Sequence, residues 1–202
     1  MKADEETPVV IKVGGSLLNL PDLAARLSRV FQQLRSRRIA LVMGGGPTAD
    51  LVRRWDSRFT LGESAAHWLA IRSLGLNESL MVAICPQCAL VESWEAADVI
   101  WSEGRIAVLS MEPLLRAAES RGEPTPPHCW DVTSDSLAAW AATRLGARLV
   151  LAKSIDRPTG SLQDAIAAGA VDACLPDIAA RGLAIDWINL RSPHFTIELW
   201  HS

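Results

Sequence analysis

The sequence predicts an α/β fold, a three-layer sandwich in which helices cover both faces of a mainly parallel sheet. Short apolar runs alternate along the chain with longer segments whose apolar residues recur at helical spacing. The first two apolar runs end directly in glycines, which is typical of tight turns from a buried strand into a helix. No repeat of solenoid length and no low-complexity segment interrupts this alternation.

The size and composition fit one compact unit. The chain has 202 residues, of which 49% are hydrophobic and 21% are charged. We expect a single domain over residues 1–202, with one lobe at about 1–122 and another at about 131–202. A net charge of −3 without a basic stripe disfavours nucleic acid as a partner. Since no apolar run approaches the ~20 residues of a membrane helix, we expect a cytoplasmic protein that does not bind membranes.

The first part of the chain reads as strands and helices in alternation. Residues 9–13 are apolar apart from Lys12, which indicates a strand buried on both faces. Pro21 suits the first turn of a helix that runs to residue 36. The further elements expected here are a strand at 39–43, helices from Thr48 and over 61–74, a helix or strand at 77–84, a strand at 106–109 and a helix at 112–121.

The clearest break is EPTPPHCW, residues 123–130, where three prolines rule out regular structure. Its end, residues 128–131, fits a lid, a wall of the acceptor site or a plain linker. Beyond it, Thr133 or Ser134 caps a helix through Leu145. The elements expected after that helix are a strand at 149–152, short helices around Gln163 and Pro176, and strands at 184–190 and 195–200.

Two glycine turns lie where a ligand binds in such a fold. Gly14 and Gly15 follow the first strand, and GGGP, residues 44–47, follows the second. Ligands of open α/β sheets bind beyond the carboxyl ends of the strands, and glycine lets backbone N–H groups converge on an anion. The two turns therefore predict facing sites for a phosphoryl donor and an acceptor, or else they are simple strand-to-helix turns. Neither turn matches the P-loop or the dinucleotide-binding motif.

Lys12 places a cation inside an apolar strand. A buried ammonium group costs desolvation free energy unless an anion meets it. At the end of the strand it can reach the glycine turn and offset charge on a phosphoryl group in transfer, a reaction catalysed mainly by positioning and electrostatics. The alternative is a lysine on an edge strand whose ammonium group reaches solvent.

Four segments in order, VIKVGGSLL, LVMGGGPTAD, VTSDSLAAWAATRLGARLVLAKSIDR and WINLRSP, resemble the amino acid kinase family over nearly the whole chain. The resemblance implies the amino acid kinase (carbamate kinase-like) fold, with the acceptor in the first lobe and the nucleotide in the second. It also implies a homo-oligomeric small-molecule kinase that uses ATP and Mg²⁺. GESAAHWLAIRSLGLN resembles the small branch of methanofuran- and tetrahydromethanopterin-linked one-carbon metabolism, which implies [5-(aminomethyl)furan-3-yl]methyl phosphate as the acceptor.

The site residues of the family map onto this chain one by one. Lys12 resembles the lysine that bridges the two phosphates, and Asp135 matches the aspartate that orients it, unless Asp135 only caps its helix. AKSIDR departs from the family pattern, and we expect its Lys153 to add a second positive charge, unless it is a solvated loop lysine. With these residues the expected nucleotide-binding set is Lys12, Gly14, Gly15, Ser16, Lys153, Ser154 and Asp156, and the expected acceptor-binding set is Gly44, Gly45, Gly46, Thr48 and His67.

Some motifs and functions stay open on the sequence alone. His67 fits an acceptor-binding or acid–base group, and it equally fits a core histidine. Cys85 and Cys88 have C-x-x-C spacing but no second pair, so packed thiols are expected rather than a metal or redox site. The rival functions are a kinase of the same fold for isopentenyl phosphate, a nucleotide or a carboxylate, and a nucleotide-binding or storage protein without catalysis.

Overall fold

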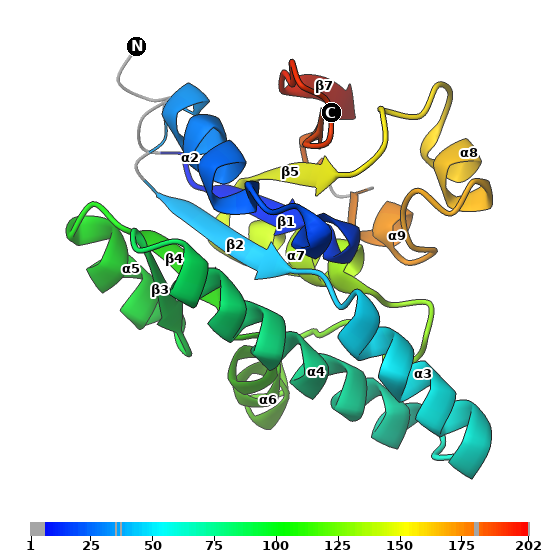
Figure 1. Ribbon diagram of the computed structural model, residues 1–202. Coiled ribbons are helices and arrows are strands. Elements are labelled where there is room, and N and C mark those ends of the chain that lie inside the picture. The colour runs from blue at the N-terminus through cyan, green and yellow to red at the C-terminus, as the bar shows by residue number, and fades with distance from the viewer. Residues whose placement is uncertain (1–6, 35, 37, 180–181, 202) are drawn as a thin grey trace.

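The computed structural model describes residues 7–34, 36, 38–179 and 182–201, which form one seven-stranded sheet between two layers of helices (Figure 1). The strands are β1 (Val9–Val13), β2 (Ile39–Met43), β3 (Cys88–Val91), β4 (Ile106–Leu109), β5 (Arg148–Lys153), β6 (Ile185–Asn189) and β7 (Glu198–His201). Their order in the sheet is β3-β4-β2-β1-β5-β6-β7, and only the β6–β7 pairing is antiparallel. The predicted α/β sandwich with a mainly parallel sheet is confirmed.

The helices follow the strands as the alternation predicts, with differences at some boundaries. They are η1 (Gly15–Asn19, a 3-10 helix), α2 (Leu23–Gln33), α3 (Pro47–Phe59), α4 (Glu63–Ile84), α5 (Trp94–Ser102), α6 (Met111–Ser120), α7 (Ser134–Leu145), α8 (Leu162–Ala167) and α9 (Leu175–Ala179). The two segments expected at 61–74 and 77–84 form the single helix α4, because Gly75 lies inside it without ending it. None of the described helices is long and apolar enough to cross a membrane.

Three elements were not expected from the sequence. They are the 3-10 turn η1 directly after β1, the short edge strand β3, and α5, which begins where the Ser93 hydroxyl accepts a hydrogen bond from the Ala96 N–H at 3.1 Å. The helix expected over 21–36 ends at Gln33, and its residue 35 lies outside the described residues. The last strand covers less than the predicted 195–200, because Phe195 packs into the core ahead of β7.

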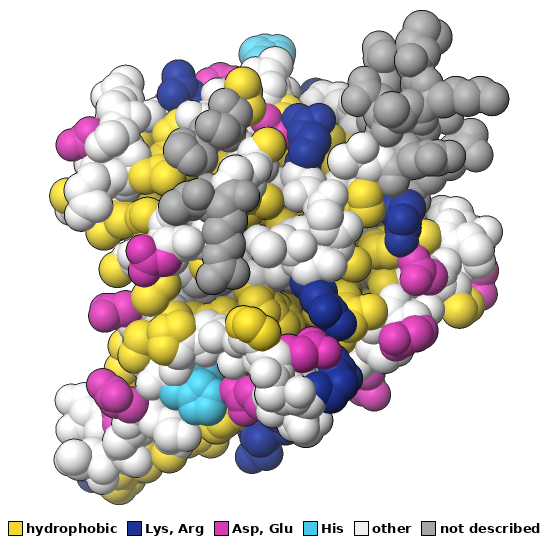
Figure 2. Space-filling model, turned by 180° about the vertical axis from the view of Figure 1, so that it is seen from behind, with side chains coloured by type: hydrophobic (Ala, Val, Ile, Leu, Met, Phe, Trp, Pro, Cys, Tyr) yellow, Lys and Arg dark blue, Asp and Glu magenta, His cyan; other side chains and the backbone are white. Residues whose placement is uncertain are grey.

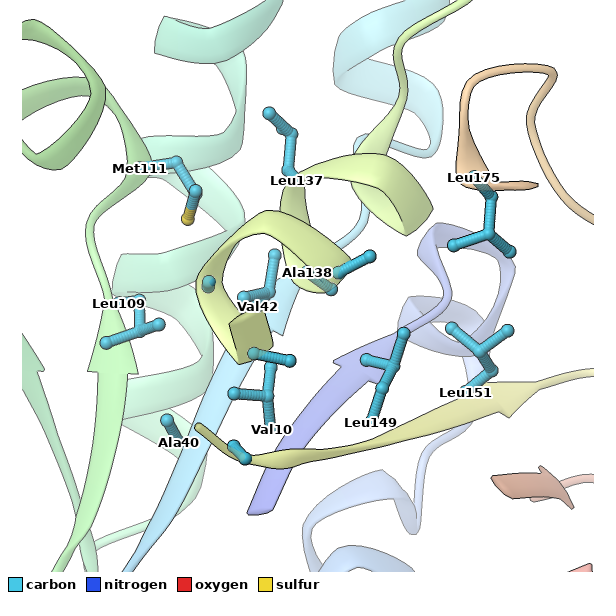
Figure 3. Packing of buried hydrophobic residues seen from close by; sticks show 14 of the residues in the cluster. Val10, Ala40, Val42, Leu109, Met111, Leu137, Ala138, Leu149, Leu151 and Leu175 are labelled. Atoms are coloured by element: carbon cyan, nitrogen blue, oxygen red, sulfur yellow. The ribbon is translucent and has the colours of Figure 1, made fainter. Parts of the chain in front are cut away.

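The core has two halves, one on each face of the sheet. Val10, Leu149 and Leu151 point toward α7 and pack against it (Figure 3), whereas Ile11 packs on the opposite face with α2. Since residues two apart in a strand share a face, Lys12 follows Val10 and Lys153 follows Leu151 on the α7 side. The apolar stripe beneath α7 therefore ends in two lysines on neighbouring strands.

Charged side chains of both signs are distributed over the surface. On the face seen in Figure 2, lysines and arginines lie among aspartates and glutamates, and no continuous basic stripe crosses the described residues of that face. The arrangement gives this face no extended field of one sign.

Glu78 is a buried carboxyl group between α4 and α6. It is 2% exposed, and its Oε1 accepts a hydrogen bond from the Met111 N–H at 3.2 Å. Burial raises the pKa of Glu78 to about 7, and the hydrogen bonds from Met111 and Ser110 oppose this shift only in part. The folded protein therefore holds a proton on Glu78 at pH values where the unfolded chain has released it.

This burial predicts a pH-dependent effect of Glu78→Gln. The folded-state pKa is raised, so the contribution of Glu78 to stability is full below about pH 4.5 and is lost as pH rises to about 7. The neutral amide keeps an acceptor for Met111 and does not titrate. The difference in unfolding free energy between Glu78→Gln and wild type should therefore shift in favour of the variant by about 1–3 kcal/mol when the pH is raised from 5 to 8. Thermal and denaturant unfolding at the two pH values would measure this shift. Glu63→Gln, exposed on the same helix, is the control, and an equal effect of Glu78→Gln at both pH values contradicts the prediction.

Candidate active site

The two glycine turns meet at the carboxyl edge of the sheet. The Gly14 N–H donates to the Ala152 oxygen and the Gly44 N–H donates to the Val13 oxygen, each at 2.8 Å, so both turns extend the ladder of the sheet. A Cβ atom added to Gly15 would lie 2.2 Å from the Gly46 nitrogen. The backbones of the two turns are therefore in direct contact, and a side chain at Gly15 would force them apart.

Beside these turns, one buried carboxylate lies between two lysines. Asp135, in the first turn of α7, has its Oδ1 2.9 Å from the Lys12 Nζ and its Oδ2 2.8 Å from the Lys153 Nζ. Asp135 is 3% exposed and Lys12 is 5% exposed. The Lys153 ammonium group also donates to the backbone oxygen of Ala170 at 2.7 Å. The three predicted catalytic residues thus form one ion-paired cluster.

The electrostatics of this cluster favour an anionic ligand. Burial alone would raise the pKa of Asp135, but the ammonium groups of Lys12 and Lys153 outweigh it and hold that pKa below its ordinary value. Burial and the neighbouring charge of Lys12 lower the pKa of Lys153 to about 8, although Asp135 opposes the shift. At neutral pH the cluster carries two cations against one carboxylate, an excess of positive charge that suits a phosphate.

A cavity of about 260 Å³ opens in front of Lys12. Gly15 and Ser16 of the first turn and Gly45 and Gly46 of the second line it together with the lysine. The cation and both glycine turns therefore line one space.

The far wall of the cavity contains residues that the sequence analysis did not identify. Arg53 lies on α3 with its guanidinium carbon 5.0 Å from the centre of the Trp130 ring, and its Nη1 is 3.1 Å from Asp50 Oδ1. The Trp130 indole N–H donates to Asp56 Oδ2 at 2.7 Å, which fixes the ring. Residues 128–131 thus include a wall residue of the cavity. Their positions in the sequence could have indicated Asp50 and Arg53 as site residues, because both lie in the first two turns of the helix that follows the second glycine turn.

Thr48, predicted as an acceptor residue, supports the second glycine turn from behind. Its hydroxyl donates to the Gly45 oxygen at 2.7 Å. The Asn77 amide on α4 donates to the oxygens of Gly44 and Gly45, both at 2.8 Å. Asn77 is buried and was not foreseen, since nothing in the sequence of α4 links it to the turn. These bonds hold the backbone of the turn in place from outside the cavity.

The structure does not bring His67 to the cavity. His67 lies buried on α4, and its ring stacks on that of His128 at 4.4 Å between centroids. Burial, with a smaller contribution from His128, lowers the pKa of His67 to about 4, so its ring is neutral at pH 7. The His128 Nε2 in turn lies 2.6 Å from Glu119. The position of His67 supports the packed-histidine interpretation rather than a role at the acceptor.

The predicted nucleotide residues connect the first glycine turn to the ends of β5 and β6. Ser16 Oγ lies 2.9 Å from Ser154 Oγ. Asp156 accepts a hydrogen bond from the Asn189 amide at 2.7 Å, and the Arg191 guanidinium donates to the Ser16 oxygen at 3.1 Å. Asn189 and Arg191 belong to the segment WINLRSP but were not singled out as site residues.

The cysteine pair lies away from these residues, where α4 passes into β3. Cys85 and Cys88 are free, buried thiols that pack in the core on the α2 side of the sheet. No group of three or more His, Cys, Asp or Glu side chains among the described residues is arranged to hold a metal ion. The geometry agrees with packed thiols.

Comparisons with known proteins add to this geometry. Residues 7–157, more than half of the chain, match the model of the amino acid kinase family. The chain is similar to the [5-(aminomethyl)furan-3-yl]methyl phosphate kinase of Methanocaldococcus jannaschii, with 26% identity over 148 residues that cover 73% of this chain and 66% of that protein, just under two thirds of its length.

Solved structures share the fold at low identity. The uridylate kinase of Archaeoglobus fulgidus has a TM-score of 0.62 at 19% identity and 88% coverage of both chains. The UMP kinase of Bacillus anthracis has a TM-score of 0.63 at 14% identity over 96% of this chain and 99% of that chain. The aspartate kinase of Synechocystis has 0.64 at 12% identity over 95% of this chain and 40% of that chain. The match to the family model, with this shared fold, shows that the chain belongs to the amino acid kinase family.

Proposed function

We propose that the protein is a kinase that transfers the γ-phosphoryl group of ATP to a small phosphorylated acceptor. One observation carries the proposal: Lys12 and both glycine turns line the same cavity, so a buried cation and two glycine turns of the kind that binds phosphate share one space. Membership of the amino acid kinase family and the similarity to a kinase from Methanocaldococcus jannaschii support it.

In this proposal each group of the site has a separate task. The first glycine turn, with Ser16, Lys153 and Ser154, would hold the nucleotide phosphates, and the second turn would hold the acceptor phosphate at the N-terminus of α3. Lys12 would offset the charge that spreads over the oxygens of the phosphoryl group during transfer. Because Asp135 already holds Lys12 in place, this cation needs no reorganisation when the reaction occurs.

Mg²⁺ would reach the site with the nucleotide. Both oxygens of Asp135 are paired with ammonium groups, so this carboxylate is not available as a metal ligand. The donor set fits Mg²⁺ held mainly by phosphate oxygens and water, which is common for this ion at nucleotide sites. When bound there, the ion would neutralise part of the phosphate charge.

The cavity favours a compact acceptor that carries a phosphate. It has a volume of about 260 Å³, and the phosphates of the nucleotide would take up part of this space beside Gly15 and Ser16. Arg53, Asp50 and Trp130 line the cavity and contact one another, with the guanidinium group 3.1 Å from Asp50 Oδ1 and 5.0 Å from the centre of the Trp130 ring. The guanidinium group would bind a phosphate in exchange for part of its contact with Asp50. These groups suit [5-(aminomethyl)furan-3-yl]methyl phosphate, which would yield a diphosphate for methanofuran-linked metabolism.

A panel of acceptors tests the proposal directly. ADP release would be measured with ATP and Mg²⁺ against the aminomethylfuran phosphate, isopentenyl phosphate, UMP, aspartate and N-acetylglutamate. We expect the furan phosphate to give the highest kcat/KM. A higher value for another acceptor would show a kinase of the same fold with a different substrate, and ATP binding without turnover of any acceptor would refute the proposed activity.

Lys12→Ala is expected to abolish measurable turnover and leave the fold intact. The variant loses a fixed cation at the transferring group, a type of loss that costs about 10²- to 10³-fold or more in kcat. Steady-state kinetics and circular dichroism would measure both effects. Arg38→Ala is the control, because it removes a half-buried cation that is paired with Asp98 before the start of β2 and does not line the cavity. Full activity in folded Lys12→Ala would exclude the role.

Arg53→Ala is expected to raise the KM for the acceptor by about 10- to 100-fold, because a hydrogen bond to a charged group contributes about 1.5–3 kcal/mol. The KM for ATP should change little, because Arg53 lines the wall on the side of the second glycine turn. Arg54→Ala is the matched control, since Arg54 neighbours Arg53 on α3 and does not line the cavity. A rise in the KM for ATP alone would contradict this assignment.

A further inference from the structure

Asp172 is a nearly buried carboxylate that lies between α8 and α9 and accepts hydrogen bonds from five donors. Its Oδ2 accepts from the Thr133 N–H at 2.9 Å, the Thr133 hydroxyl at 2.8 Å and the Ser136 N–H at 2.9 Å. Its Oδ1 accepts from the Ser136 hydroxyl and from the Leu175 N–H, the latter at 3.1 Å. Asp172 is 9% exposed, and neither the cavity lining nor the lysine cluster includes it.

These bonds supply the N-terminal cap that α7 does not make for itself. The residue in the cap position, Thr133, makes no side-chain cap bond within its own helix. The first N–H groups of a helix have no partners inside it, and a negative charge at that end is favourable. Asp172, 39 residues after Thr133 and 36 after Ser136, satisfies an N–H group of each.

The capped turn is the one that carries Asp135. Asp135 lies between Thr133 and Ser136 in the chain, so the two anchors to Asp172 enclose it. The same downstream segment reaches the cluster at a second point, because the backbone oxygen of Ala170 accepts a hydrogen bond from the Lys153 ammonium group at 2.7 Å. Residues 170–172 are thus connected to both partners of the Asp135–Lys153 ion pair. Ala170 accepts a hydrogen bond from Lys153 directly, and Asp172 binds the turn of α7 that carries Asp135.

We propose that Asp172 is a positioning residue of this site, which holds the first turn of α7 so that Asp135 stays between Lys12 and Lys153. Its effect on turnover rests on the proposed kinase function, whereas its effect on the lysines does not. An oxygen of Asp135 only a few tenths of an ångström away from its place would lengthen one ion pair or both. Thr133 and Ser134, which line the cavity, would move with the same turn.

Asp172→Asn tests this role with two readouts. An amide nitrogen cannot accept, so in either orientation at least two of the five hydrogen bonds are lost. We expect kcat to fall about 10- to 100-fold, as for a small misplacement of a reacting group, with the KM for ATP changed less than about 3-fold. The second readout is the pH dependence of Lys153 acetylation by acetic anhydride, followed by peptide mass spectrometry. Its midpoint near pH 8 in the wild type should move in the variant.

Controls separate positioning from simple stability. Asp177→Asn, an exposed carboxylate on α9, should leave kcat and the Lys153 midpoint unchanged. Ser136→Ala removes one bond to Asp172 and keeps the other four donors, so it should give a smaller change in both readouts. This variant provides the test if Asp172→Asn does not fold. All kinetics would be measured well below the unfolding temperature of each variant.

The outcomes discriminate between the two proposals. A folded Asp172→Asn with wild-type kcat and an unmoved Lys153 midpoint overturns the positioning role, and so does a lower Tm without any change in the midpoint. A moved midpoint in a protein that phosphorylates none of the acceptors supports the positioning of the cluster and refutes the kinase function instead.

Discussion

The whole site depends on one carboxylate shared by two ammonium groups. Lys12 and Lys153 lie at or next to the ends of neighbouring strands on the same face of the sheet, where burial and the charge of Lys12 disfavour the charged form of Lys153. Asp135 offsets both effects from the start of α7. Removing the carboxylate would leave two like charges buried together, which is far more costly than the loss of a surface ion pair. The excess positive charge that remains is what an anionic ligand would meet.

The fold supplies this arrangement through the parallel sheet. Parallel strands bring their carboxyl ends to one edge, so the segments after β1, β2 and β5 converge although they are far apart in the chain. Contact between the two turns requires glycine, since a Cβ atom at Gly15 or Gly44 would collide with the facing backbone. Gly15, Gly45 and Gly46 of these turns also line the cavity. Close packing of the two turns thus keeps side chains out of this part of the cavity wall.

Much of this could be predicted, and the failures have physical causes. Strands β2 and β4 were placed at their observed bounds because they are short, fully apolar runs. The edge strand β3 was missed because CALV directly follows a proline-containing turn and begins with the second cysteine of the C-x-x-C pair, so its start was not recognised. His67 lies on a helix that is apolar around most of its circumference, so its spacing could not show which neighbour it faces. Arg53 and Trp130 come together only because the segment before α7 folds back onto α3.

The sequence by itself determined the α/β alternation apart from η1, β3 and α5, the two glycine turns, and the two lysines of the cluster. These features depend on local pattern or on residue type in a buried strand, whereas Asp135 was indicated by the resemblance to the family. Only the tertiary structure decided which groups support them. Asn77 holds the second turn from 32 and 33 residues away, and Asp172 caps α7 from 36 and 39 residues away. Hydrogen bonds between such distant residues leave no periodic trace in a chain, since they arise only after packing has placed donor and acceptor together.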